Sequence, residues 1–171
     1  MKIVVLFPTA SEAEFFRREG VEVVFSGVGI AAAAYMTAKV ILEKRPDVLI
    51  MGGIAGVYPH SSLKVGDTVL VGTEHLADLG FFYEDGFRPF SAMNFDMNFE
   101  LVHRVDCPWL KPDMPLPVAV SNTMNSAMSP YVRTEGVDIE SMEGAPFFYV
   151  CQKEGVRFFE VRSISNVVDL G

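Results

Sequence analysis

The chain has few of the residue types that build metal centres and disulfide frameworks. Its 171 residues include two cysteines, Cys107 and Cys151, which are too few for a disulfide framework and form no C-x-x-C pair. Its three histidines, His60, His75 and His103, are isolated in the sequence, with no H-x-x-x-H spacing. Zinc sites need several such ligands at regular spacing, so the sequence predicts no metal site.

Positive charge and long apolar runs are also scarce. The chain has 14 Lys and Arg against 22 Asp and Glu, which gives a net charge of −8. Proteins that bind nucleic acid normally carry a basic patch, so we expect no nucleic-acid partner. The uncharged stretches 23–38 and 48–63 contain glycines or a proline and are shorter than the ~20 residues of a membrane-spanning helix. We therefore expect no membrane association and a cytoplasmic location.

Apolar side chains are abundant for a protein of this size. Half of the residues are hydrophobic and 21% are charged, with a mean hydropathy of +0.27. Disordered chains are poor in apolar residues, so disorder is excluded, and the length fits a single domain over residues 1–171. The apolar surplus predicts that part of the surface is buried in an oligomer interface.

The predicted elements alternate between strands and helices. Residues 2–7 form a continuous β-branched run typical of a buried strand, and an alanine-rich helix over residues 30–44 ends before Pro46. The β-α-β-α-β order predicts an α/β fold with a largely parallel sheet. The other expected strands are 21–25, 48–51, 67–72, 116–120 and 158–163, and the other expected helices are 11–19 and 144–154. For the aromatic stretch 81–117 we expect long loops with one helix near 95–105.

Two glycine-rich segments are candidate ligand-binding loops. SGVG at residues 26–29 follows a strand and opens a helix, as in dinucleotide-binding proteins, but Ala32 stands where the third glycine would be. A tight turn is the favoured interpretation, and we expect no cofactor, although backbone N–H groups there can receive an anion or a hydroxyl. GGIAG at residues 52–56 stands just past the third strand, and a ligand-binding loop and a plain turn both remain open.

Several polar side chains stand at the ends of strands and helices. Glu12 and Glu14 follow the first strand, Glu140 and Glu143 precede the second long helix, and Asn166 follows the last strand. An acid at the carboxyl end of a strand suits general acid–base catalysis, whereas an acid in the first turn of a helix also compensates the helix dipole. Position alone leaves both roles open for Glu12, Glu14 and Glu143.

Five segments, taken in order, resemble the nucleoside phosphorylase/nucleosidase family. They are MKIVVL with SEAEF, SGVGIAAAA, PDVLIMGGIAG, VGDTVLVGTEHLADLG and VDIESMEGAPFFYVCQKEGVRFFEVRSISN. The sequence is closest to the hydrolytic branch, which includes futalosine hydrolase and methylthioadenosine/S-adenosylhomocysteine nucleosidase. The resemblance implies a phosphorylase/hydrolase-like three-layer α/β/α fold with a central mixed, largely parallel sheet. It also implies a homodimer, which agrees with the apolar surplus, and a single domain that lacks the C-terminal helix usual in the family.

The resemblance assigns roles to individual residues. By this likeness Met142 and Glu143 hold the ribose, and the Glu143 carboxylate takes its hydroxyls. Glu14, with Glu12 as the alternative, positions and deprotonates the attacking water. Asn166 stands where the family has an acid that acts on the purine at N7. Residues expected to line the sugar and base are Gly53, Ile54, Ala55, Gly56, Ser121, Asn122, Thr123, Met124 and Ser165.

These roles imply hydrolysis of the N-glycosidic bond of a purine nucleoside. The ISN ending resembles futalosine hydrolase most, so futalosine, an intermediate of menaquinone biosynthesis, is the first choice of substrate. The glycine-rich loops contain no arginine motif that would hold phosphate, which favours hydrolysis over phosphorolysis. Methylthioadenosine/S-adenosylhomocysteine nucleosidase activity, phosphorolysis, and nucleoside binding without turnover remain the alternatives.

Overall fold

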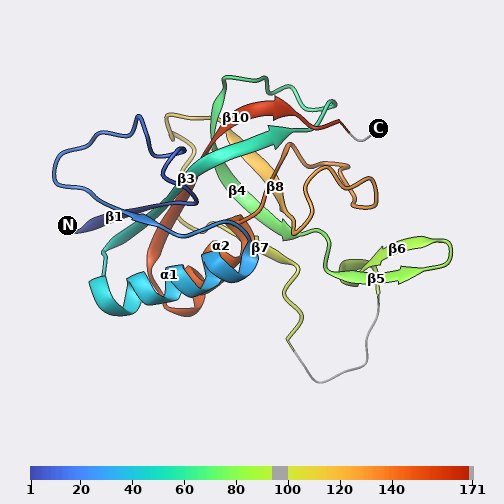
Figure 1. Ribbon diagram of the computed structural model, residues 1–171, viewed down its shortest axis with the longest axis horizontal. Coiled ribbons are helices and arrows are strands. Elements are labelled where there is room, and N and C mark those ends of the chain that lie inside the picture. Colours follow the sequence, from blue (N-terminus) through green and yellow to red (C-terminus); the bar gives the residue numbers. More distant parts are fainter. Residues whose placement is uncertain (94–99, 170–171) are drawn as a thin grey trace.

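The computed structural model describes residues 1–93 and 100–169, which form a large sheet, a small hairpin and two α-helices (Figure 1). The helices are α1 (Ile30–Lys44) and α2 (Gly144–Lys153). The strands of the large sheet are β1 (Ile3–Phe7), β2 (Glu22–Phe25), β3 (Val48–Val57), β4 (Thr68–Leu76), β7 (Arg104–Asp106), β8 (Val118–Thr123), β9 (Ile139–Ser141) and β10 (Arg157–Val167). The hairpin consists of β5 (Gly80–Tyr83) and β6 (Gly86–Pro89), and the short 3-10 helix η1 (Phe90–Ala92) follows it.

The large sheet mixes parallel and antiparallel strands and closes on itself. Its order is β10-β4-β8-β9-β3-β1-β2, and β10 also pairs with β3. The strands β1, β2, β3 and β10 run parallel to their neighbours in this group, whereas β10 is antiparallel to β4 and β3 is antiparallel to β9. The expected α/β class with a central mixed sheet is confirmed.

The sheet has two apolar faces that are covered differently. In β1, Val4 and Leu6 belong to the main core, which also contains buried side chains of α1 and α2. Both helices lie together on this face (Figure 1). Val5 and Phe7 face the other way and pack with Ala13 from the turns between β1 and β2. The described residues therefore show one helical layer, on the face of the main core.

Strand β3 is longer than the sequence predicts. Residues 52–56 were expected just past a strand that ends at Met51, but β3 continues through them to Val57, so that expectation is wrong. Side chains of neighbouring elements occupy the space beside these glycines. A Cβ at Gly52 would lie 2.6 Å from the Phe7 ring, and one at Gly53 would lie 2.5 Å from Arg162 Nη1. Glycine is needed here because functional and core side chains fill the space beside the strand.

The other differences from prediction concern short elements. Residues 11–15 form turns, and no helix forms over residues 11–19, because the hydrogen bonds span three residues and do not continue as an i to i−4 series: Glu14 N donates to Ser11 O and Phe16 N donates to Ala13 O. Of the helix expected near 95–105, residues 95–99 lie outside the described part of the chain, residues 100–103 have no regular secondary structure, and residues 104–105 belong to β7. Strand β9, with three residues, was not predicted. The helices α1 and α2 and strand β1 are confirmed nearly to the residue.

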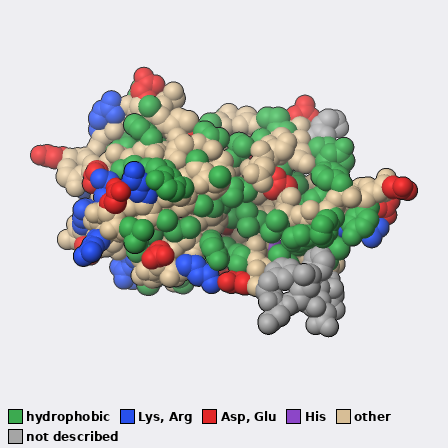
Figure 2. Space-filling view, turned by 60° about the horizontal axis from the view of Figure 1, so that its bottom comes forward, with side chains coloured by type: hydrophobic (Ala, Val, Ile, Leu, Met, Phe, Trp, Pro, Cys, Tyr) green, Lys and Arg blue, Asp and Glu red, His purple; other side chains and the backbone are tan. Residues whose placement is uncertain are grey.

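The β5–β6 hairpin extends from the sheet and carries exposed aromatic side chains. Phe82 is 69% exposed, and Phe81 and Tyr83 are also exposed. Figure 2 shows hydrophobic side chains gathered around this hairpin, with acidic side chains at its tip. In the described part of the chain, neither α-helix combines the length and the apolar character needed to cross a membrane.

Candidate active site

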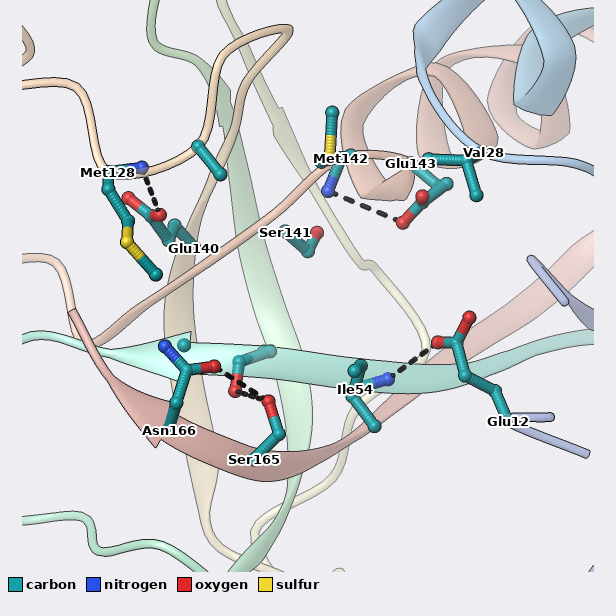
Figure 3. Close-up of a pocket in the computed structure, with 13 residues that line it drawn as sticks. Glu12, Val28, Ile54, Met128, Glu140, Ser141, Met142, Glu143, Ser165 and Asn166 are labelled. Carbon is teal, nitrogen blue, oxygen red and sulfur yellow. Dashed lines mark hydrogen bonds between the residues drawn. The ribbon is translucent and has the colours of Figure 1, made fainter.

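A cavity of about 270 Å³ opens where β3, β9 and β10 meet the start of α2 (Figure 3). It brings together three carboxylates, those of Glu12, Glu140 and Glu143. Among the described residues that line it there is no lysine, arginine or histidine. The lining residues are Glu12, Val28, Ile54, Ala55, Gly56, Ala127, Met128, Glu140, Ser141, Met142, Glu143, Ser165 and Asn166.

Glu143 is buried at one end of the cavity, directly before α2. Its Oε1 accepts a hydrogen bond from Gly29 N at 3.3 Å, and its Oε2 accepts from Met142 N at 3.3 Å. Gly29 caps the N-terminus of α1, where the helix dipole favours negative charge. Each oxygen therefore has a fixed partner, and the remaining lone pairs can accept hydroxyl groups of a ligand in the cavity.

Arg162 supports Glu143 from behind the cavity wall. Its side chain is 1% exposed, and its Nη1 donates to Glu143 Oε2 at 3.2 Å and to Ile54 O at 3.1 Å. Its Nε donates to Glu160 Oε1 at 2.7 Å. Burial opposes the charged form, but the charges of Glu160 and Glu143 raise the pKa of Arg162, so the guanidinium stays charged. Arg162, on β10, thereby connects Ile54 of β3 with the Glu143 carboxylate at the start of α2.

Two further carboxyl groups, Glu74 and Glu160, are fully buried below the start of α2. Glu74 Oε2 accepts a hydrogen bond from Thr123 Oγ1 at 2.6 Å. A Cβ at Gly144 would collide with the Glu74 carboxyl group, so the glycine leaves the space in which this group lies. Burial, and next the charge of Glu160, raise the pKa of Glu74 well above its ordinary value. Burial also raises the pKa of Glu160, against the lowering effect of Arg162.

Replacing Glu74 with glutamine is expected to flatten the dependence of stability on pH. Because its pKa is raised, the folded protein keeps a proton that the unfolded chain loses near pH 4.5. The stabilisation is full below that pH and is lost as pH rises toward the folded pKa, with a slope of at most about 1.4 kcal/mol per pH unit. Glutamine keeps an oxygen for Thr123 and does not titrate. Chemical unfolding between about pH 5 and 8 measures this, and equal slopes for both proteins would contradict the assignment.

Glu12, and not Glu14, lies at the cavity. Glu12 Oε1 accepts a hydrogen bond from Thr9 Oγ1 at 2.9 Å, and its Oε2 accepts from Ile54 N at 2.9 Å. Figure 3 shows its carboxylate on the same side of the cavity as Glu143. Glu14 is exposed and is absent from the lining, because the turns at 11–16 point its side chain outward. Of the two residues predicted for water activation, the geometry favours the alternative, Glu12.

Asn166 and Ser165, on β10, lie at the opposite end of the cavity, near Glu140 and Met128 (Figure 3). Ser165 Oγ donates to Asn166 Oδ1 at 2.8 Å, and Asn166 Nδ2 donates to Val167 O at 3.2 Å. A carbonyl oxygen only accepts, so these partners identify the nitrogen of the amide. The second N–H of that nitrogen is available to a ligand.

Some residues expected along the base and sugar lie elsewhere. Met142, Ile54, Ala55, Gly56 and Ser165 line the cavity as expected. Gly53 lines a neighbouring apolar groove, which shares Glu12 and Ile54 with the cavity. The expected residues on and just after β8 are buried and absent from the cavity lining, namely Ser121, Asn122, Thr123 and Met124.

The cavity and the wall behind it also contain functional groups that the sequence did not single out for these roles. Glu140 was noted only for its place before a helix, and Arg162, Met128 and Ser141 were not proposed as site residues. A signal was present for Arg162, because a cation within the apolar run of a buried strand requires a buried partner. In the described residues, no group of three or more His, Cys, Asp or Glu side chains is arranged to hold a metal ion.

Comparison with known proteins gives consistent matches. Residues 15–171 match the family model described as the phosphorylase superfamily. A 5′-methylthioadenosine/S-adenosylhomocysteine nucleosidase from Exiguobacterium sp. is 33% identical over 156 residues, covering 84% of this chain and 66% of that protein. A futalosine hydrolase from Thermus thermophilus is 30% identical over 187 residues, covering 94% of this chain and 81% of that protein. The chain thus spans about two thirds of the first relative and about four fifths of the second.

Solved structures share the fold. The structure of a Helicobacter pylori futalosine hydrolase mutant superposes with a TM-score of 0.75 at 20% identity, covering 99% of this chain and 87% of that one. A mutant nucleosidase from Helicobacter pylori with 5′-methylthioadenosine in its active site gives a TM-score of 0.74 at 19% identity, with the same coverage of 99% and 87%. At these identities the likeness establishes the fold.

Proposed function

The chain belongs to the phosphorylase superfamily, and on that premise we propose that it hydrolyses the N-glycosidic bond of a purine nucleoside, with futalosine as its substrate. The observation that carries the proposal is the charge of the cavity. Three carboxylates and no cationic side chain stand among its described lining residues. A phosphate nucleophile would be repelled there, whereas a neutral water molecule can be bound and deprotonated.

The proposed mechanism divides the reaction between the two ends of the cavity. Glu143 accepts the ribose hydroxyls, beside Met142, and its negative charge favours the positive charge that develops on the sugar. Glu12, held by Thr9 and Ile54, takes a proton from water as the water oxygen bonds to C1′.

The bond from C1′ to N9 breaks as the bond from water forms, and its electron pair leaves with the base. The free N–H of Asn166 donates a hydrogen bond to N7 and stabilises the negative charge there. An amide cannot supply a proton, so the departing base takes its proton from solvent. Glu143, Glu12 and Asn166 would thus provide ribose binding, water activation and base stabilisation.

The choice of futalosine rests on Asn166. The ISN sequence resembles the futalosine hydrolases, and the relative of that name matches over 94% of this chain. The 33% identity to a methylthioadenosine/S-adenosylhomocysteine nucleosidase supports that activity as the second candidate. We also propose a homodimer, in which the exposed aromatic side chains of the β5–β6 hairpin would be covered.

A substrate panel tests the proposed function. The purified protein is incubated with futalosine, methylthioadenosine and inosine, with and without phosphate, and free base is measured for each. The proposal expects the highest kcat/KM for futalosine. A higher value for methylthioadenosine favours the second candidate. Binding of these nucleosides in calorimetry without release of base from any of them would contradict a nucleosidase and leave a nucleoside-binding protein.

Removing the amide of Asn166 is expected to slow the chemical step. Asn166→Ala loses the N–H that stabilises the departing base, so kcat should fall by about a hundredfold with a smaller change in KM. Asn125→Ala is a matched control, because its exposed side chain binds the half-buried Asp78 outside the cavity. Steady-state kinetics of both variants measures the effect. An unchanged kcat in Asn166→Ala would remove Asn166 from the mechanism.

A further inference from the structure

Behind the Glu143 carboxylate, the protein buries more acids than bases. In the described part of the chain Arg162 is the one buried cationic side chain, whereas Glu143, Glu160 and Glu74 are all buried near it. The proposed mechanism uses Glu143 and gives the other two acids no task. A buried charge without a counter-charge is costly, so the contacts of each acid decide which of them is ionised.

Two of these acids have the donors that an ionised carboxylate needs. Arg162 Nε donates to Glu160 Oε1 at 2.7 Å, and Arg162 Nη1 donates to Glu143 Oε2 at 3.2 Å. Glu143 also accepts the backbone N–H groups of Gly29 and Met142, and it faces the cavity (Figure 3). A cation and hydrogen-bond donors beside a carboxylate favour its charged form. Glu160 and Glu143 therefore share the positive charge of Arg162.

The hydrogen bonds of Glu74 define which of its oxygens carries a proton. The backbone N–H of Ala145 donates to Thr123 Oγ1 at 2.7 Å, so the hydroxyl proton of Thr123 points to Glu74 Oε2, at 2.6 Å. Glu74 Oε2 is thus an acceptor. In a carboxylic acid the carbonyl oxygen is the better acceptor, so a proton on Glu74 is carried by the other oxygen, Oε1.

That second oxygen of Glu74 lies beside Glu160. A Cβ at Gly144 would collide with Glu74 Oε1 and would lie 2.7 Å from Glu160 Oε1, so the two carboxyl groups are neighbours at this glycine. Burial raises the pKa of Glu160, whereas Arg162 and a hydrogen bond from Glu74 lower it. Two adjacent carboxylates repel each other, but a proton on one of them joins the pair by a hydrogen bond. Because Arg162 keeps Glu160 ionised, this proton belongs to Glu74.

We propose that Glu74 is a positioning residue that acts on Glu143 through Arg162. Its proton satisfies the second oxygen of Glu160, so Arg162 gives Glu160 one N–H and keeps Nη1 for Glu143. Without that proton, Glu160 would take two N–H groups of the guanidinium, as carboxylates do in bidentate pairs, and Glu143 would lose a fixed donor. This inference rests on the proposed function, because it gives the ribose hydroxyls to Glu143.

Two variants of nearly equal size separate the proton of Glu74 from its bulk. Glu74→Gln has an amide N–H that can donate to Glu160, whereas Glu74→Met has no donor. Calorimetry measures the binding of inosine in the Glu12→Gln background, in which hydrolysis is slow. Glu74→Met is expected to bind inosine about tenfold more weakly than this parent, and Glu74→Gln within about twofold of it. Equal inosine affinity in the two variants would overturn the proposal.

Hypoxanthine is the internal control, because it lacks the ribose. Both variants should keep the parent's affinity for it within about twofold, since the base contact attributed to Asn166 lies at the opposite end of the cavity (Figure 3). Glu43→Met, which changes an exposed acid on α1, is the matched variant and should keep both affinities. An equal loss of inosine and hypoxanthine affinity in Glu74→Met would show a general structural effect and overturn the positioning role.

Infrared spectroscopy tests the proton itself, on protein without ligand. Exposed carboxyl groups are ionised at neutral pH, whereas a protonated carboxyl group has a separate C=O stretching band at higher wavenumber. Wild-type protein is expected to show this band, and Glu74→Gln is expected to lack it. Absence of the band from wild-type protein, or an unchanged band in Glu74→Gln, would overturn the proposal. This measurement decides even where Glu74→Met does not fold.

Turnover separates this inference from the proposed function. Wild-type protein that releases no base from any nucleoside contradicts the hydrolase; inosine affinity that falls in Glu74→Met and recovers in Glu74→Gln still supports the role of Glu74. Wild-type protein that releases base, with equal inosine affinity in the two variants, supports the hydrolase and contradicts the role of Glu74. A parent protein that binds no inosine contradicts both.

Discussion

Glu143→Ala is expected to abolish nucleoside hydrolysis while the protein remains folded. The carboxylate has fixed donors behind it, and its remaining lone pairs are open toward a ligand in the cavity. Its loss removes the acceptor for the ribose hydroxyls and the negative charge near the developing sugar cation. We expect kcat/KM to fall by about a thousandfold or more, because binding and charge stabilisation are lost together.

The control for this variant is an exposed acid of the same helix region. Glu154→Ala alters the C-terminal cap of α2, away from the cavity, and should keep wild-type activity. Circular dichroism and thermal melting show whether Glu143→Ala is folded. Glu143→Asp keeps the charge with a shorter reach and should recover part of the activity. A folded Glu143→Ala protein with near-normal activity would show that the cavity is not the site of ribose binding.

The second large effect is expected at Glu12. Glu12→Gln keeps an oxygen for its donors but cannot take a proton from water, so kcat should fall by about a hundredfold to a thousandfold. KM should change little, because the substrate contacts attributed to Glu143 remain. Steady-state kinetics with futalosine separates these two parameters.

Glu14→Gln is the matched control for Glu12→Gln. It makes the same chemical change two residues away, on an exposed side chain outside the cavity lining, and should leave kcat within about twofold of wild type. A large loss of kcat in Glu14→Gln with little change in Glu12→Gln would contradict this assignment. It would show that Glu14, the first choice from the sequence, deprotonates the water.

The sequence predicted the long regular elements because their signals are local. The β-branched run at β1 and the alanine-rich stretch before Pro46 have clear periodicity and clear ends, and both elements appear where expected. The predicted third strand ended too early, at Met51, because glycines such as Gly52 and Gly53 are typical of turns. In the structure they lie within β3 and leave space for the side chains of Phe7 and Arg162. That packing depends on residues distant in sequence, which local patterns do not contain.

The site was predicted in part for the same reason. The ESMEG and ISN motifs pointed to Glu143 and Asn166, and both residues line the cavity, while the roles that the family resemblance supplies for them stay predictions. The choice between Glu12 and Glu14 depends on how the turns after β1 direct two side chains, and the family resemblance, which gave Glu14 first, does not describe these turns. The link from Glu160 through Arg162 to Glu143 joins β10 to the start of α2, and only the folded structure brings these groups together.

Release of free base from futalosine in phosphate-free buffer tests most directly whether this cavity is a hydrolytic site. Wild-type protein is expected to release base and free sugar at the same rate with and without phosphate, and Glu143→Ala is expected to release none. Base release that requires phosphate, or equal release by wild-type protein and Glu143→Ala, would contradict hydrolysis in this cavity.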